Sequence, residues 1–214
     1  MAFIGKIKGK CESIYTQNYI KHFNNNARKK LTNKDFSIIA PNCIGGVLYH
    51  RLGLEFKSPT VNLFFGSNKD YMRFISNLKH YLSLDLKFIE RERNYPTGML
   101  DDVKIVFNHY KTEEQAEEKW NQRKQRVNYD NLFIIMDDRY VSYDDIKKFG
   151  EIPCKGRVCF SAKAYPEFNY VLPIKKYAGE ERVGIYMLEK NMLTYKYPFD
   201  DDFDFVNWLN TGKI

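Results

Sequence analysis

Long apolar runs are missing from this 214-residue chain: no window approaches about 18 consecutive apolar residues, and none of about 7 follows the basic start. We therefore expect neither a membrane span nor a signal peptide. The four cysteines include no CxxC pair, which disfavours a disulfide framework or structural zinc and fits the reducing cytoplasm. No metal site is expected, and the sequence leaves any cofactor unknown.

Apolar residues make up 43% of the chain and aromatic residues 16%, which is typical of a folded globular protein. Lysine and arginine number 34 against 27 acidic residues, giving a net charge of +7. Such a surface attracts anions. We expect an anionic or phosphate-containing small molecule or glycan as the partner. Nucleic acid is not expected, because no recognised nucleic-acid motif occurs and basic and acidic residues are mixed.

Strand and helix patterns alternate through residues 36–160, which favours a sheet that is mostly parallel and covered by helices. The predicted fold is a three-layer α/β domain whose ligand site lies beyond the carboxyl ends of the strands. Polar residues around Pro96 and Gly98 predict a turn. The expected strands are 36–40, 86–89, 103–107, 132–136, 183–188 and 192–197, and the expected helices are 45–52, 68–82 and 112–127 with a short one after Ser142.

Residues 9–31 have the pattern of a basic amphipathic helix. We therefore divide the chain into a basic N-terminal helix, 1–34, and a single α/β domain, 35–214. The helix either packs on the domain or docks on a membrane surface. The expected location is accordingly cytoplasmic, with peripheral contact to the inner face of the membrane as the alternative.

The segment from Asn42 to Gly46 follows a short strand and opens a helix. Asn42 is a good N-cap and would place Cys43 in the first turn, where helix dipole and free amides lower a thiol pKa. Gly45 and Gly46 would let a substrate oxygen approach the backbone N–H groups. Cys43 is thus either a nucleophile or a small buried apolar residue.

A cysteine nucleophile needs a base, and His109 follows the apolar strand 103–107. A parallel sheet would bring its ring near Cys43. The other histidines, including His50, are interpreted as surface residues or satisfied ones.

Two arginines lie on helix 112–127. Arg123 falls on the apolar stripe that contains Trp120, so we expect it to be buried against a carboxylate or an anionic substrate. The same helix periodicity predicts that Arg126 is solvated.

Aspartates end the apolar strand 132–136. Asp137 and Asp138 could orient a histidine, activate a hydroxyl or bind a cation, and the alternative is turn and cap chemistry. We expect one of them to share a cleft with Cys43 and His109. The later run 200–202 is interpreted as a solvated turn.

Four segments resemble a bacterial family of unknown function often labelled exopolysaccharide biosynthesis protein: FSIIAPNCIGG, SPTVNLFF, NHYKTEEQA and KWNQRKQRVN. The resemblance covers residues 35–165. The chain is more distantly similar to papain-like cysteine peptidases, although its alternation of strand and helix patterns argues against a papain fold. The positions that match the family motifs are Asn42, Cys43, Gly45, Gly46, His109, Trp120, Arg123 and Arg126.

The resulting hypothesis is a cytoplasmic transferase or hydrolase of cell-surface polysaccharide synthesis. Cys43 would be its nucleophile and His109 its base, and Arg123 and Arg126 would bind the substrate. One alternative is a metal-dependent nucleotide-sugar glycosyltransferase that uses Asp137 and Asp138. Another is a non-enzymatic module that binds anionic glycan or lipid.

Overall fold

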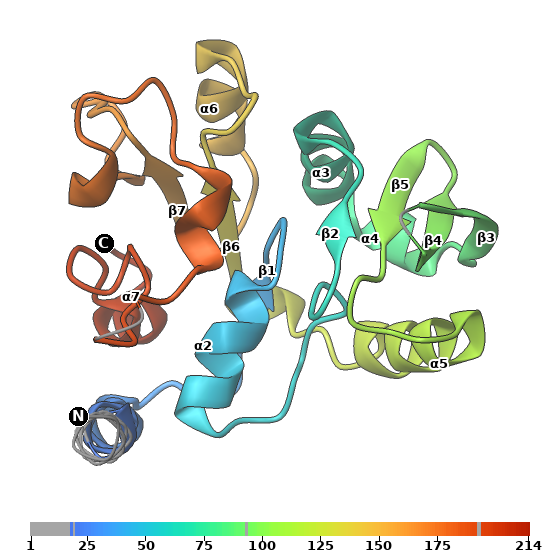
Figure 1. Cartoon of the computed structure of the whole chain (residues 1–214), viewed down its shortest axis with the longest axis horizontal. Coiled ribbons are helices and arrows are strands. Elements are labelled where there is room, and N and C mark those ends of the chain that lie inside the picture. Colours follow the sequence, from blue (N-terminus) through green and yellow to red (C-terminus); the bar gives the residue numbers. More distant parts are fainter. Residues whose placement is uncertain (1–17, 19, 93, 192–193) are drawn as a thin grey trace, which may run out of the picture.

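The computed structural model describes residues 18, 20–92, 94–191 and 194–214. One sheet has four parallel strands in the order β1-β6-β7-β8 (Figure 1). Its strands are β1 (Ser37–Ile39), β6 (Leu132–Asp137), β7 (Gly156–Ser161) and β8 (Val171–Pro173). A parallel sheet flanked by helices confirms the predicted α/β class.

The second sheet is antiparallel and was not predicted. Its order is β2-β5-β4-β3, and its strands are β2 (Phe64–Phe65), β5 (Val103–Val106), β4 (Tyr95–Leu100) and β3 (Lys87–Glu92). The turn expected at Pro96 and Gly98 is wrong, since both residues lie in β4. A Cβ on Gly98 would lie 2.6 Å from Leu86 Cδ1, so the glycine lets Leu86 pack over the strand.

Beyond the N-terminal helix, the described residues contain six α-helices: α2 (Ile44–Leu52), α3 (Asn68–Ser76), α4 (Leu78–Ser83), α5 (Glu113–Lys124), α6 (Tyr143–Phe149) and α7 (Phe205–Thr211). The expected helix 68–82 is therefore two helices, broken at Asn77, whose ψ of 50° is not helical. Residues 20–30 are also helical, and the rest of the predicted N-terminal helix lies largely outside the described residues. No described helix is both long and apolar enough to cross a bilayer.

Side-chain caps start three of these helices. The side chain of Ser67 accepts the N–H of Asp70, and Thr112 accepts that of Gln115. Ser142 and Asp145 form a reciprocal capping box. Each cap satisfies amides that the first turn leaves without a partner.

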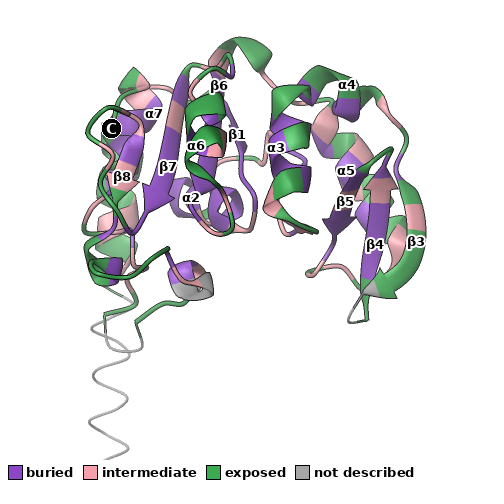
Figure 2. Cartoon of the chain, turned by 90° about the horizontal axis from the view of Figure 1, so that it is seen from above, coloured by how far each residue is buried: buried purple, intermediate pink, exposed green. Residues whose placement is uncertain are grey.

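Strand β6 shows how the parallel sheet forms the middle of three layers, with an apolar core on each face. Phe133 and Ile135 point into one apolar core, with α2, α7 and the N-terminal helix. Ile134 and Met136 point into the other, with α3, α5 and α6. Figure 2 shows the buried strands β6 and β7 among helices whose outer faces are exposed. Alternation along a fully buried strand thus builds a core on each face.

The strand expected at 183–188 is wrong. A short 3₁₀ helix, Ile185–Leu188, occupies this region. Part of the strand expected at 192–197 lies outside the described residues, and the described part, 194–197, is not a strand. Its backbone bonds are local: Asn191 N–H donates to Lys196 O at 2.9 Å, and Tyr195 N–H to Asn191 O at 2.7 Å.

Candidate functional site

The turn between β1 and α2 carries the candidate nucleophile. Asn42 Oδ1 accepts the N–H of Ile44 at 3.1 Å, but Asn42 lies one residue before the N-cap position that was predicted for it. Cys43 occupies the N-cap position, with φ −67° and ψ −1°, one residue earlier than predicted. The turn is also tied to β6, because Asn42 Nδ2 lies 3.4 Å from Asp137 Oδ2.

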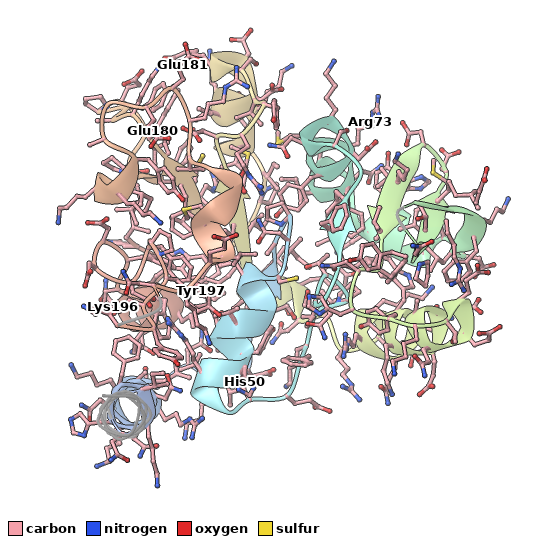
Figure 3. All side chains as sticks on the ribbon, in the orientation of Figure 1. His50, Arg73, Glu180, Glu181, Lys196 and Tyr197 are labelled. Atoms are coloured by element: carbon pink, nitrogen blue, oxygen red, sulfur yellow. The ribbon has the colours of Figure 1, made fainter. Side chains whose placement is uncertain are left out.

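A cavity of about 700 Å³ opens beside this turn. Its walls come from the N-terminal helix, α2, the loop after α2, the residues after β5 and a C-terminal segment, the described residues 188–191 and 194–200. Figure 3 shows part of this wall, with His50 on α2 and Lys196 and Tyr197 on the adjoining C-terminal segment. The size lies within the range of small-molecule sites, about 300–1,000 Å³.

One face of α2 lines the cavity. Cys43, Gly46, Val47 and His50 all belong to its lining, and the spacing i, i+3, i+4, i+7 places them on the same side of the helix. Gly45 points elsewhere: its Cβ would lie 3.3 Å from Ile38 Cγ2. Gly45 therefore permits the close approach of α2 to β1.

Cys43 and His109 line the same cavity. A shared parallel sheet was expected to bring them together. This expectation was wrong, because the strand before His109 is β5 of the antiparallel sheet. Cys43 is half-buried and His109 is exposed. Asn108, which precedes His109 in the sequence, also lines the cavity and makes a side-chain hydrogen bond with Cys43. The structure thus brings together two of the predicted catalytic residues.

Burial raises the pKa of the Cys43 thiol above its ordinary value, and the hydrogen bond with Asn108 opposes this in part. The lowered pKa expected from the helix start is therefore wrong. Desolvation of the thiolate outweighs the amide donors. In the free protein the Cys43 thiol stays protonated near neutral pH, so it needs a base to become a nucleophile.

Neither predicted aspartate lines this cavity. Asp137 is buried and receives two hydrogen bonds from Arg139, at 2.9 and 2.7 Å. Asp138 accepts from Ser161 Oγ, from Ala162 N–H and, through its other oxygen, from Val183 N–H, each at 2.8 Å. The expected cleft thus holds Cys43 and His109 but neither Asp137 nor Asp138. These two carboxylates instead hold neighbouring loops against the end of β6 through the hydrogen bonds given above.

Metal ligands do not gather in the described part of the chain, where no three His, Cys, Asp or Glu side chains are placed to hold an ion. Asp138 is already saturated by three protein donors, and Arg139 neutralises Asp137. A cation at this pair would have to displace these contacts.

Arg123 is buried as predicted, with 9% of its surface exposed. The predicted anionic partner is wrong for the described residues: its Nη1 donates to Tyr110 Oη at 2.6 Å and lies 3.3 Å from Val61 O. The guanidinium also lies 5.1 Å from the ring centroid of Phe56. Arg123 does not line the cavity but supports Phe56, which does.

Arg126 forms a 2.9 Å ion pair with Glu55, whose side chain is 60% exposed. It is absent from the cavity lining, so the structure does not bring this predicted substrate-binding residue to the site.

The model of the DUF1919 family, described as a domain of unknown function, matches residues 14–210. An uncharacterised protein of Haemophilus influenzae is 39% identical over 188 residues, covering 87% of this chain and 90% of the relative. The chain belongs to the DUF1919 family. Neither match carries the exopolysaccharide or peptidase label suggested by the sequence resemblance.

In this DUF1919 chain, sequence reasoning missed the distant walls of the cavity. Asp200 was expected in a solvated turn, yet its carboxylate is 3% exposed and accepts Arg51 at 2.5 and 2.6 Å. His50 is exposed, as interpreted from the sequence, but its place on the cavity face of α2 was not predicted. Its spacing of seven from Cys43 could have revealed it. Lys190 and Lys196, also in the lining, carry no such local signal.

Proposed function

We propose that this protein is a transferase or hydrolase whose nucleophile is Cys43 and whose general base is His109. The observation that carries the proposal is that both side chains line one cavity although they are far apart in sequence. A half-buried thiol and a solvent-accessible imidazole in one cavity are groups suited to nucleophilic catalysis.

In the proposed reaction, His109 takes the thiol proton as Cys43 Sγ attacks the electrophilic atom of the substrate. The leaving group departs with its bonding electrons and takes the proton from His109. Water or an acceptor hydroxyl then attacks the covalent intermediate and gives its proton to His109. The bond to Cys43 Sγ breaks, and the thiolate that leaves takes this proton from His109, which restores the thiol. Asn108, hydrogen-bonded to Cys43, holds the sulfur and favours its anionic form.

The proposed setting is cytoplasmic synthesis of a cell-surface polysaccharide. Free thiols at the three described cysteines, Cys43, Cys154 and Cys159, support a reducing compartment. The exposed lysines of the helix 20–30 support contact with an anionic surface. Sequence resemblance to the exopolysaccharide family supports the choice of substrate.

A binding module without catalysis is the second candidate. It is favoured by the raised pKa of Cys43, which leaves little thiolate in the absence of a base. A metal-dependent glycosyltransferase that uses Asp137 and Asp138 has less support, because both carboxylates are engaged by protein donors.

The test is a search for a covalent intermediate. The full chain is incubated with nucleotide sugars and sugar phosphates extracted from bacterial cells, quenched in acid, and analysed by intact-mass and peptide mass spectrometry. We expect an adduct on Cys43 that Cys43→Ser abolishes and that the control Cys154→Ser retains. Turnover of an extracted substrate by Cys43→Ser at the wild-type rate would refute the nucleophile.

A further inference from the structure

The cavity is basic beyond Cys43. His50 lies seven residues further along α2, about 10 Å at 1.5 Å per residue, and Lys190 and Lys196 also line the cavity. Asp200 is the single carboxylate among the lining residues that the structure describes, and Arg51 already holds it. The described lining of the cavity therefore has a surplus of positive charge.

Lys190 is the cation best placed to meet a ligand. It is exposed, and its Nζ lies 5.3 Å from the ring centroid of Tyr197. Within the described ranges, no ion pair joins Lys190 to a carboxylate, whereas Lys196 is paired with Asp201 at 2.5 Å. An ammonium group above an aromatic ring can still donate all three protons to an anion.

The other walls offer hydrogen-bond acceptors. Asn24 Oδ1 and Asn108 Oδ1 are buried, and neither has a partner in the described part of the chain. Both residues line the cavity. A buried amide oxygen without a donor costs free energy, and the hydroxyl groups of a ligand would satisfy it. Phe23 and Phe56 add apolar faces to the same lining.

We propose that this cavity binds a sugar phosphate. His50 and Lys190 hold the phosphate, while Asn24 and Asn108 accept hydrogen bonds from sugar hydroxyls. The inference rests on the proposed function, because it places the sugar within reach of Cys43 at the start of α2 and the phosphate at the far end of the same helix face.

Binding of defined probes tests this subsite. Calorimetry on the full chain compares three sugar 1-phosphates, of glucose, galactose and N-acetylglucosamine, with glucose and inorganic phosphate. At least one sugar phosphate should bind more tightly than either half alone. Lys190→Gln should weaken it about 10- to 100-fold, the value of a hydrogen bond to a charged group, and Lys190→Arg should restore most of the affinity.

Lys176→Gln is the matched control. Lys176 is also an exposed lysine above a tyrosine, with its Nζ 5.8 Å from the Tyr177 ring centroid, but it does not line the cavity. The Lys176→Gln variant should bind the sugar phosphate with wild-type affinity. Absence of sugar-phosphate binding, or equal binding by Lys190→Gln and wild type, would overturn the subsite.

Cys43→Ser separates the subsite from the catalytic proposal. The thiol is not a phosphate ligand, so this variant should bind the sugar phosphate with wild-type affinity while it forms no covalent adduct. If wild type forms the Cys43 adduct yet binds no sugar phosphate, the subsite is wrong and the nucleophile stands. If the subsite binds while Cys43→Ser still turns over substrate, the nucleophile is wrong and the subsite stands.

Discussion

Breaking the buried ion pair between Arg51 and Asp200 should destabilise the fold strongly. The two side chains are 11% and 3% exposed and are joined by two hydrogen bonds, of 2.5 and 2.6 Å. The Arg51 guanidinium also lies 4.9 Å from the ring centroid of Tyr197 and 5.3 Å from that of Phe23. The pair therefore connects α2, the N-terminal helix and the C-terminal segment under the cavity.

Removing one partner leaves the other charge buried, which costs about 3–5 kcal/mol. We expect this loss for Asp200→Asn and for Arg51→Met, each of which keeps the approximate shape of the side chain. The double variant removes both charges, so it should lose less than the sum of the two, with a coupling energy of about 1–3 kcal/mol.

Urea unfolding followed by circular dichroism measures these free energies, and the exposed pair of Arg126 and Glu55 gives the control. Those side chains are 30% and 60% exposed, so Arg126→Met and Glu55→Gln should each cost about 0–1 kcal/mol. A loss for Asp200→Asn no larger than for Glu55→Gln would refute the reasoning from burial.

Three further predictions concern backbone, cap and pH. Gly212→Ala should destabilise the protein more than Gly179→Ala by urea unfolding, because both residues have positive φ but only at Gly212 would a Cβ meet backbone, 2.4 Å from Lys155 O; equal losses would contradict this. Ser142→Ala removes the capping box of α6 and should cost about 1 kcal/mol, and an unchanged urea midpoint would contradict it. Burial raises the folded-state pKa of the Cys43 thiol. The contribution of this thiol to folding stability is therefore complete below the unfolded pKa of about 8.5 and is lost as pH rises through the folded pKa. The free energy of unfolding should fall less for Cys43→Ser than for wild type between neutral and alkaline pH, and parallel pH profiles would refute this prediction.

Local signals in the sequence predicted the start of α2 and the burial of Arg123. Pro41 lies just after β1 and the Asn42 side chain accepts the N–H of Ile44, and both effects act within a few residues. The stripe that contains Trp120 predicted burial of Arg123 because helix periodicity alone determines which face a residue occupies. The partner of Arg123 could not be predicted in this way, since Val61 lies in a different loop.

Non-local pairing explains most of what the sequence did not reveal. Strand β4 contains proline and glycine, and only its neighbours β3 and β5 make it a strand. Asp200 lies in a run of aspartates and pairs with Arg51, 149 residues away. The pKa of Cys43 depends on how deeply tertiary packing buries the thiol, which a helix start cannot show.

The pH dependence of Cys43 alkylation in wild type and in His109→Gln tests the central claim most directly. Iodoacetamide labelling with peptide mapping gives the rate at Cys43, and His80→Gln, which alters a histidine outside the cavity lining, is the control. If His109 is the base, its loss should slow labelling near neutral pH by about tenfold or more, in the range of general-base contributions, while His80→Gln labels like wild type. Labelling of Cys43 at the same rate in His109→Gln and wild type, or only after unfolding, would contradict the pairing.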